Sequence, residues 1–121
     1  MHEITYDQVK LFIKTYPLKF NPGQNKISYP IIVRIHKRLQ EGHSFSNIKV
    51  QNNIINDGHH RFISLSLLDL EISHDMAGEN IAKQLPIEWK DVELDSEDYD
   101  TEKQRKEYNE RYDKPLENNV L

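Results

Sequence analysis

The stretch "NDGHHRF", residues 56–62, places two histidines and an arginine immediately before the apolar run "ISLSLLDL". Positive side chains at the beginning of a helix oppose the helix dipole, at a cost of about 0.3 to 1 kcal/mol each. A strand that ends at Asp57 and Gly58, followed by a helix that begins at His59, would leave free backbone N–H groups at the turn. Such groups bind anions. The stretch therefore predicts a phosphate-binding turn.

Three side-chain properties support this prediction. Gly58 lets an anion approach the backbone closely, because it has no Cβ. Arg61 offers a planar fork of N–H donors that matches phosphate oxygens. The imidazoles of His59 and His60 add further donors, and a bound anion would offset the unfavourable placement of the positive charges.

The same residues have a simpler interpretation, which the sequence leaves open. Asp-Gly is a common turn, Asp57 could cap the helix, and exposed histidines are ordinary. A metal site made by Asp57, His59 and His60 is disfavoured, because adjacent histidines diverge and no HxxxH or HExxH spacing occurs. The remaining histidines are scattered and are expected at the surface: His2, His36, His43 and His74.

A hairpin and a buried helix must position this turn. "SNIKVQ" and "IIND" predict two short strands around residues 52–53, because asparagine tolerates the positive φ that tight hairpin turns demand. "HRFISLSLLDLEI" predicts a helix over residues 60–72 that is apolar around most of its circumference and therefore largely buried. We expect Leu65 and Leu68 to be almost fully buried there.

Two more helices are predicted before the hairpin. "TYDQVKLFIKTY" has apolar residues at helical spacing, a capping box made by Thr5 and Gln8, and a stop at Pro17. "SYPIIVRIHKRLQEG" has Pro30 where a first helical turn tolerates it and Gly42 at the expected C-terminal cap. The β-branched residues of this second segment leave a strand open as an alternative.

The C-terminal part changes character. "LPIEWKDVEL" alternates and then slips phase, which predicts a strand that contains a bulge or leaves the sheet at residues 90–91, with Trp89 in the core. From Asp95 onward the chain is dense in charge, which predicts at best a polar helix that contributes little to the core. The order of elements indicates a small α+β domain over residues 1–95, followed by a charged helical tail over residues 96–121.

Composition excludes several classes of protein. A chain of 121 residues forms one domain. Its net charge of -4 argues against broad binding to nucleic-acid phosphates, which needs a basic face. The absence of cysteine excludes disulfides, thiolate metal sites and cysteine nucleophiles. No apolar run approaches the roughly 18 residues of a membrane span, and the N-terminus lacks a signal-peptide profile, so we expect a cytoplasmic protein.

The segment "NIKVQNNIINDGHHRFISLSLLDLEI" resembles the central segment of the ParB/sulfiredoxin-like superfamily. In that family a strand hairpin ends in a Gly-x-x-Arg or Asp-Gly-His-x-Arg motif and is followed by a buried helix. The preceding "IHKRLQEGHSFSNIKV" is similar to the family's lead-in, with Asn47 in place of the usual proline, and "LPIEW" is similar to the next strand. The resemblance covers roughly residues 28–94 and implies a mixed sheet flanked by helices.

This resemblance implies a nucleotide-binding site. Gly58 is then the glycine that phosphate approaches, His60 and Arg61 are phosphate ligands, and Asp57 orients Mg²⁺ or an acceptor hydroxyl. His59 stands where sulfiredoxins carry their catalytic cysteine, so repair of cysteine sulfinic acids is not expected.

Kinase-like members of the family also use a glutamate, for which Glu3 and Glu41 are candidates in this chain. Chromosome-partitioning members carry a helix-turn-helix domain after this core, and no such domain is expected here.

The leading hypothesis is therefore a protein that hydrolyses ATP or another nucleoside triphosphate, or transfers its phosphate, with Mg²⁺. His59 would be an acid–base group, since an imidazole titrates near neutrality. The alternative is a non-catalytic interaction protein, such as an antitoxin, an immunity protein or a phage inhibitor. Its acidic tail would dock on a basic partner through Tyr99, Tyr108 and Tyr112. A nuclease acting on DNA is disfavoured by the charge balance.

Overall fold

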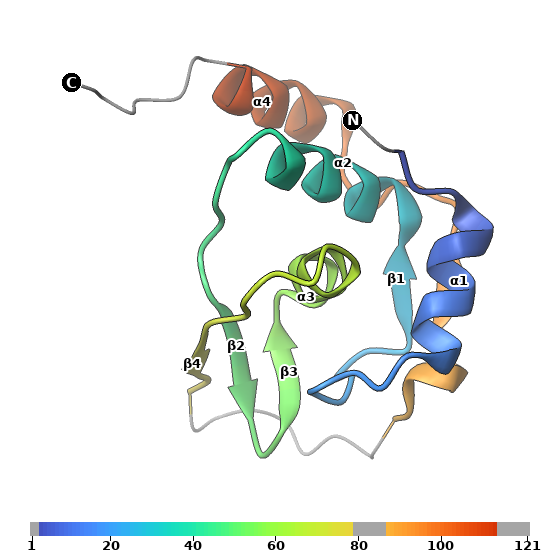
Figure 1. The fold of residues 1–121 in the computed structure, drawn as a ribbon. Coiled ribbons are helices and arrows are strands. Elements are labelled where there is room, and N and C mark those ends of the chain that lie inside the picture. Colours follow the sequence, from blue (N-terminus) through green and yellow to red (C-terminus); the bar gives the residue numbers. More distant parts are fainter. Residues whose placement is uncertain (1–2, 79–86, 114–121) are drawn as a thin grey trace.

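The computed structural model of the chain describes residues 3–78 and 87–113. Figure 1 shows α4 above α2, α2 above α3, and α3 above a small sheet. In chain order the elements are α1 (Tyr6–Thr15), β1 (Lys26–Ser28), α2 (Tyr29–Gln40), β2 (Ile48–Gln51), β3 (Ile54–Asp57), α3 (His59–Leu67), β4 (His74–Met76), the 3-10 helix η1 (Trp89–Asp91), β5 (Glu93–Asp95) and α4 (Glu102–Tyr112).

The strands form two small sheets. The first has the order β3-β2-β4, in which β2 pairs antiparallel with β3 and parallel with β4. The second consists of β1 and β5, paired in parallel. This mixture of helices with parallel and antiparallel strands confirms the predicted α+β class. β1 and β4 were not predicted, because three-residue strands carry no periodicity that a sequence pattern can reveal.

The hairpin was predicted correctly. Asn52 and Asn53 join β2 to β3 with φ values of 52° and 67°. Only a few residue types adopt this left-handed conformation at low cost, and asparagine is one of them. The hairpin therefore delivers Asp57 directly to the start of α3.

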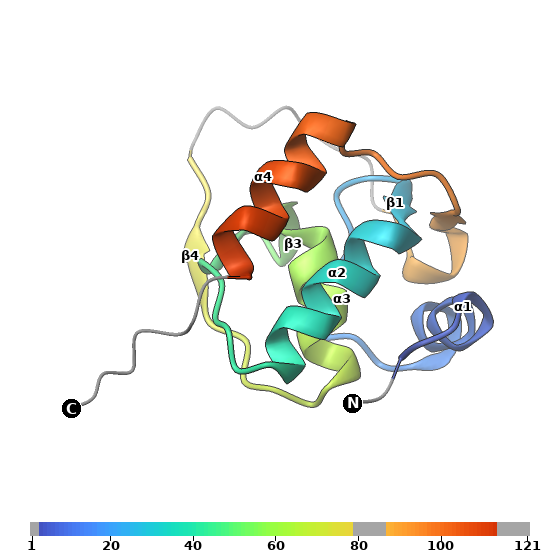
Figure 2. The same cartoon turned by 90° about the horizontal axis from the view of Figure 1, so that it is seen from above.

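α3 lies between α2 and the sheet (Figure 1), and α2 lies over α3 when the fold is seen from above (Figure 2). Two of its own residues, Phe62 and Ile63, are fully buried. The predicted extension to Ile72 is wrong: α3 ends at Leu67, and Asp69 turns the chain with a φ of 54°. The predicted near-complete burial of Leu65 and Leu68 is also wrong. Both residues are only half-buried near the C-terminal end of the helix.

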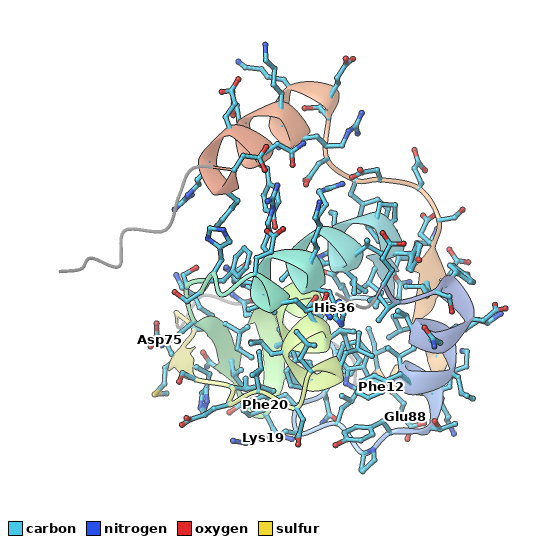
Figure 3. The ribbon with its side chains drawn as sticks, turned by 45° about the horizontal axis from the view of Figure 1, so that its top comes forward. Phe12, Lys19, Phe20, His36, Asp75 and Glu88 are labelled. Atoms are coloured by element: carbon cyan, nitrogen blue, oxygen red, sulfur yellow. The ribbon has the colours of Figure 1, made fainter. Side chains whose placement is uncertain are left out.

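The first two helices follow their sequence signals. The Thr5–Gln8 capping box is present in α1. α2 begins with Pro30 in its first turn, and Gly42 follows its end with a φ of 97°, so the strand alternative is wrong. One residue was misjudged, since His36 is 4% exposed and lies on the inner side of α2 (Figure 3) rather than at the surface.

The segment after the sheet differs from the predicted strand. Over the described part of that segment the chain forms η1, which accounts for the phase slip, and only then the short strand β5. The remaining positions of the predicted strand, 85–86, lie outside the described residues. Trp89 is buried as expected, and its indole N–H donates to the backbone oxygen of Phe20 at 2.7 Å.

α4 is the polar helix that the sequence predicts. It begins with a capping box of Thr101 and Gln104 and contains no buried residue. It lies above α2 in Figure 1, and ion pairs from Asp100 and Asp113, which flank α4, join it to α2. Among the described residues, no helix has the length and apolar character needed to cross a membrane.

Candidate functional site

A pocket of about 290 Å³ lies between α2, the beginning of α3 and α4. Four of the five predicted site residues line it: Asp57, Gly58, His60 and Arg61. The opposite walls come from α2, through residues that include Arg34, and from the C-terminal segment, through Asp100, Tyr108 and Tyr112. The structure thus brings the predicted turn together with residues about 40 to 50 positions later in the chain.

Gly58 is required by its conformation and by its neighbours. Its φ of 101° lies in the left-handed region, where a Cβ causes strain. A Cβ at this position would lie 2.6 Å from Nη2 of Arg61 and 2.7 Å from Cγ2 of Ile48. The missing side chain therefore lets the Arg61 guanidinium lie directly against the turn.

The first turn of α3 has free donors. Gly58 is the N-cap residue and no side chain caps the helix, so the expectation that Asp57 might cap it is wrong. The first bond of the helix runs from the N–H of Phe62 to the oxygen of Gly58, at 2.8 Å. The backbone N–H groups of residues 59–61 therefore precede the helical hydrogen-bond ladder.

Arg61 combines partnered and unpartnered donors. Nη2 donates to Oδ2 of Asp57 at 3.1 Å, and Nη1 donates to Oγ of Ser46 at 2.9 Å. Nε is buried and has no hydrogen-bond partner among the described residues. Asp57 is mostly exposed, so its ion pair with Arg61 is weakened by solvent. Arg61 therefore keeps capacity for an anionic ligand.

His59 is turned away from the pocket and has a structural role. Its side chain is 4% exposed, and Nε2 accepts the backbone N–H of Gly23 at 2.8 Å. Burial, together with a smaller contribution from the neighbouring His60, lowers the pKa of His59 to about 4, whereas Asp57 opposes the shift. A ring that is neutral near pH 7 and bonded at Nε2 does not suit the predicted acid–base role, which therefore has no support in the geometry.

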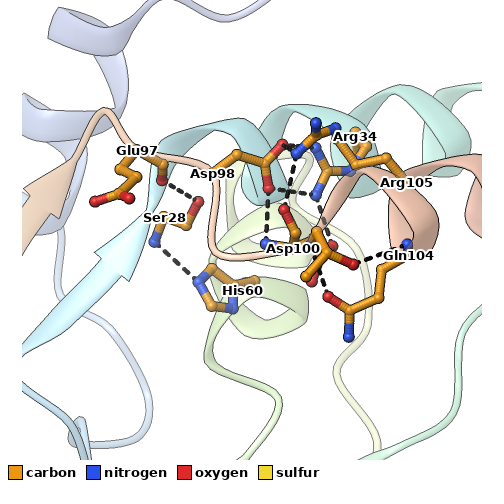
Figure 4. Close-up of polar contacts among 9 residues, drawn as sticks. Ser28, Arg34, His60, Glu97, Asp98, Asp100, Gln104 and Arg105 are labelled. Atoms are coloured by element: carbon orange, nitrogen blue, oxygen red, sulfur yellow. Dashed lines mark hydrogen bonds and ion pairs between the residues drawn. The ribbon is translucent and has the colours of Figure 1, made fainter.

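His60 lines the pocket and also holds the fold together (Figure 4). Its Nε2 accepts the backbone N–H of Ser28 at 2.9 Å, and Oγ of Ser28 donates to the backbone oxygen of Glu97 at 2.8 Å. Burial lowers the pKa of His60 to about 4, although Asp100 acts in the opposite direction. Because Nε2 is the acceptor, Nδ1 carries the proton of the neutral ring. The two histidines are thus not the exposed residues of the simpler interpretation.

Arg34 is a site residue that the sequence did not single out. Its Nη2 donates to Asp98 at 2.9 Å and to Asp100 at 2.6 Å, while Nη1 donates to the second oxygen of Asp98 (Figure 4). The hydrogen bond to Arg34 is the largest cause that lowers the pKa of Asp98. These contacts bind the segment before α4 to α2. Arginine in a helical pattern is ordinarily solvated, so the sequence alone gave no signal for them.

Tyr108 and Tyr112 bring an aromatic wall to the pocket. Their ring centroids are 4.6 Å apart, and the ring of Tyr112 lies 5.1 Å from that of Phe45. The hydroxyl of Tyr108 is buried and has no hydrogen-bond partner among the described residues. Both tyrosines were predicted as contacts to a protein partner. Their i, i+4 spacing places them on one face of the helix, and this spacing could have indicated that they pack together against the domain.

The two candidate glutamates, Glu3 and Glu41, lie outside the pocket lining. Glu41 accepts a hydrogen bond from Arg38 at 2.9 Å. No group of three or more histidine, aspartate or glutamate side chains among the described residues could hold a metal ion. The Asp57 side chain itself is mostly exposed to solvent.

No protein-family model matches this chain, and neither a curated protein nor a solved structure shows significant similarity to it. Membership of the ParB/sulfiredoxin-like superfamily therefore stays a prediction from the motif and its flanking segments.

Proposed function

We propose that this protein binds the phosphate groups of a nucleotide in the pocket at the Gly58 turn. The observation that carries the proposal is the buried Nε of Arg61, which has no partner among the described residues yet belongs to a pocket-lining side chain. A buried donor without a hydrogen bond costs about 1 to 3 kcal/mol, which an acceptor oxygen in the pocket would offset. The free N–H groups at the start of α3 favour an anion at the same place.

The charges around the pocket are balanced before a ligand binds. Arg34 and Arg61 face Asp100 and Asp57, and each arginine has a carboxylate partner. A phosphate group would compete with Asp57 for the fork of Arg61, and Mg²⁺ would relieve the repulsion between that phosphate and the carboxylate. Nucleoside triphosphates such as ATP, bound as their magnesium complexes, are the ligand class that meets both conditions.

The motif resemblance extends the proposal to chemistry. As a ParB/sulfiredoxin-like protein, the chain would hydrolyse a nucleoside triphosphate or transfer its terminal phosphate. Proteins that do so mainly position the reacting groups and neutralise charge. Asp57 is the residue placed to orient Mg²⁺ or an acceptor hydroxyl, while Arg61 and the backbone of the turn would hold the phosphates.

The alternative of an interaction protein with an acidic docking tail has less support. Asp98 and Asp100 are paired with Arg34, and Asp113 is paired with Arg38, all within the chain. These carboxylates are therefore already neutralised by the protein's own arginines.

Thermal unfolding of the wild type and of Arg61→Ala, with and without a panel of magnesium nucleotides, tests the proposal. A ligand at 100 times its dissociation constant stabilises the wild type by about 2.7 kcal/mol, and Arg61→Ala should lose most of this stabilisation. Lys19→Ala, an exposed cation on the loop after α1, is the charge-matched control and should retain it. No stabilisation of the wild type by any nucleotide would refute the proposal and leave the interaction protein as the better account.

A further inference from the structure

The C-terminal helix contributes Tyr108 and Tyr112 to a pocket that has both polar and apolar lining residues. The polar part of the lining comes from the Gly58 turn, His60 and the charged residues Arg34, Asp57, Arg61 and Asp100. The apolar and aromatic part of the lining comes from Ile31, Ile35, Phe45, Tyr108 and Tyr112. A pocket of this kind matches a ligand that joins an anionic group to a flat ring.

The aromatic part of the lining is held in place by contacts within the chain. Tyr112 packs on Phe45 with an angle of 32° between the rings, and Tyr108 lies tilted at 46° to Tyr112. The guanidinium carbons of Arg34 and Arg38 lie 5.9 and 6.0 Å from the centre of the Tyr108 ring. These distances are within the range of cation–π attraction, which helps to position the ring.

The hydroxyl of Tyr108 indicates a polar partner beyond the chain itself. It is buried without a hydrogen bond among the described residues, whereas a phenylalanine would fill the same space without burying a polar group. A buried hydroxyl that finds no partner is costly. It can both donate and accept, as the edges of nucleobases and the hydroxyls of ribose require.

The size of the pocket limits what enters it. A volume of about 290 Å³ is at the lower limit of small-molecule sites, which suits one planar ring with its sugar and the nearest phosphate. α4 has no buried residue, so this wall is attached through ion pairs and ring contacts rather than through the core.

We infer that α4 forms the base subsite of the nucleotide pocket, in which Tyr108 and Tyr112 hold the planar base while the Gly58 turn holds phosphate. This inference rests on the proposed function and adds that the charged C-terminal segment is part of the binding site. Stacking of one base on an aromatic side chain contributes about 1 to 3 kcal/mol, which corresponds to about 5- to 150-fold in affinity.

The test compares a complete nucleotide with its phosphates alone. Calorimetric titration of the full chain with magnesium ATP, GTP, CTP and UTP, and with magnesium tripolyphosphate, measures the contribution of the base. The wild type should bind at least one nucleotide about 5- to 150-fold more tightly than tripolyphosphate. Tyr108→Leu should lower that nucleotide's affinity towards the tripolyphosphate value and leave tripolyphosphate binding unchanged.

Two further variants separate the ring from the hydroxyl and from general effects of α4. Tyr108→Phe keeps the ring and removes one hydrogen bond, so it should weaken nucleotide binding by only about 2- to 10-fold. Tyr16→Ala removes an exposed tyrosine that does not line the pocket, and its affinities should equal those of the wild type.

The outcomes distinguish the two proposals. Equal affinity of the wild type for nucleotides and tripolyphosphate, or unchanged nucleotide affinity in Tyr108→Leu, overturns the base subsite while phosphate binding stands. Loss of tripolyphosphate binding in Tyr108→Leu also overturns it, because the tyrosine would then support the turn rather than the base. Absence of binding by any of these ligands to the wild type overturns the proposed function and the inference together.

Discussion

The two histidines and the two arginines around the Gly58 turn are close together but are used in opposite ways. His59 and His60 each accept a backbone N–H at Nε2 and have a pKa near 4, so they are neutral parts of the hydrogen-bonded framework. Arg34 and Arg61 line the pocket with charged groups, and Arg61 has a buried donor without a partner in the described chain. Within one motif, His59 and His60 thus stabilise the fold, whereas the adjacent Arg61 is available to bind a ligand.

The histidine side of this comparison predicts the largest effect, a loss of stability in mild acid. The unfolded chain takes up protons at histidine below about pH 6.5, whereas the folded rings do so only near pH 4. Stability is therefore retained above pH 6.5 and lost as the pH falls towards 4. At pH 5 the loss is about 2 kcal/mol for each histidine and about 4 kcal/mol for both.

Denaturant unfolding of the wild type at pH 7.5 and pH 5.0 measures this loss. Gln can accept the same backbone N–H without titrating, so a His59→Gln, His60→Gln double variant should lose much less stability between these pH values. His74→Gln, on the exposed strand β4, should behave as the wild type does. An equal loss in the double variant would show that other groups control the acid response.

Gly58, which both the histidines and the arginines surround, predicts an intermediate loss of stability. Gly58→Ala should destabilise the fold by about 1 to 3 kcal/mol, because the left-handed φ strains a residue with a Cβ. The added Cβ would also displace Arg61, so binding of nucleotide should weaken as well. Gly78→Ala is the matched control, since a Cβ there meets no atom within 4 Å. Thermal unfolding of both variants checks the prediction, and equal stabilities would contradict it.

The arginine side predicts the smallest effect on stability. Asp98→Asn should remove one charged partner of Arg34 and destabilise the protein by about 1 kcal/mol. The loss should appear locally, as faster amide hydrogen exchange in α4, while α3 keeps its protection. Asp75→Asn, on the exposed strand β4, is the control. Equal acceleration in α3 and α4 would show that the C-terminal helix is part of the cooperative core.

Local signals explain what the sequence predicted well. The capping box of α1, the asparagine pair of the hairpin and the glycine at the start of α3 each require a particular residue type at a particular backbone conformation. Such requirements are visible within a few residues of sequence. The α+β class and the place of the turn followed from them.

Long-range packing explains what the sequence could not predict. The parallel pairing of β1 with β5 joins segments 67 positions apart, and nothing local marks it. α3 ends early because Asp69 turns the chain, although the apolar pattern continues to Ile72. The return of Asp100, Tyr108 and Tyr112 to the pocket depends on ion pairs with α2, which look in the sequence like an ordinary solvated charge run.

The most direct test of the central claim is a nitrogen-15 NMR titration of the full chain with a magnesium nucleotide that stabilises it. The account predicts that the largest shifts occur at the backbone amides of residues 59–61 and at the Nε–H of Arg61, which should move as it gains an acceptor. The side-chain resonances of His59 should stay nearly constant, because its ring is bonded to Gly23 away from the pocket. Shifts that spare Arg61 and cluster elsewhere would contradict the account.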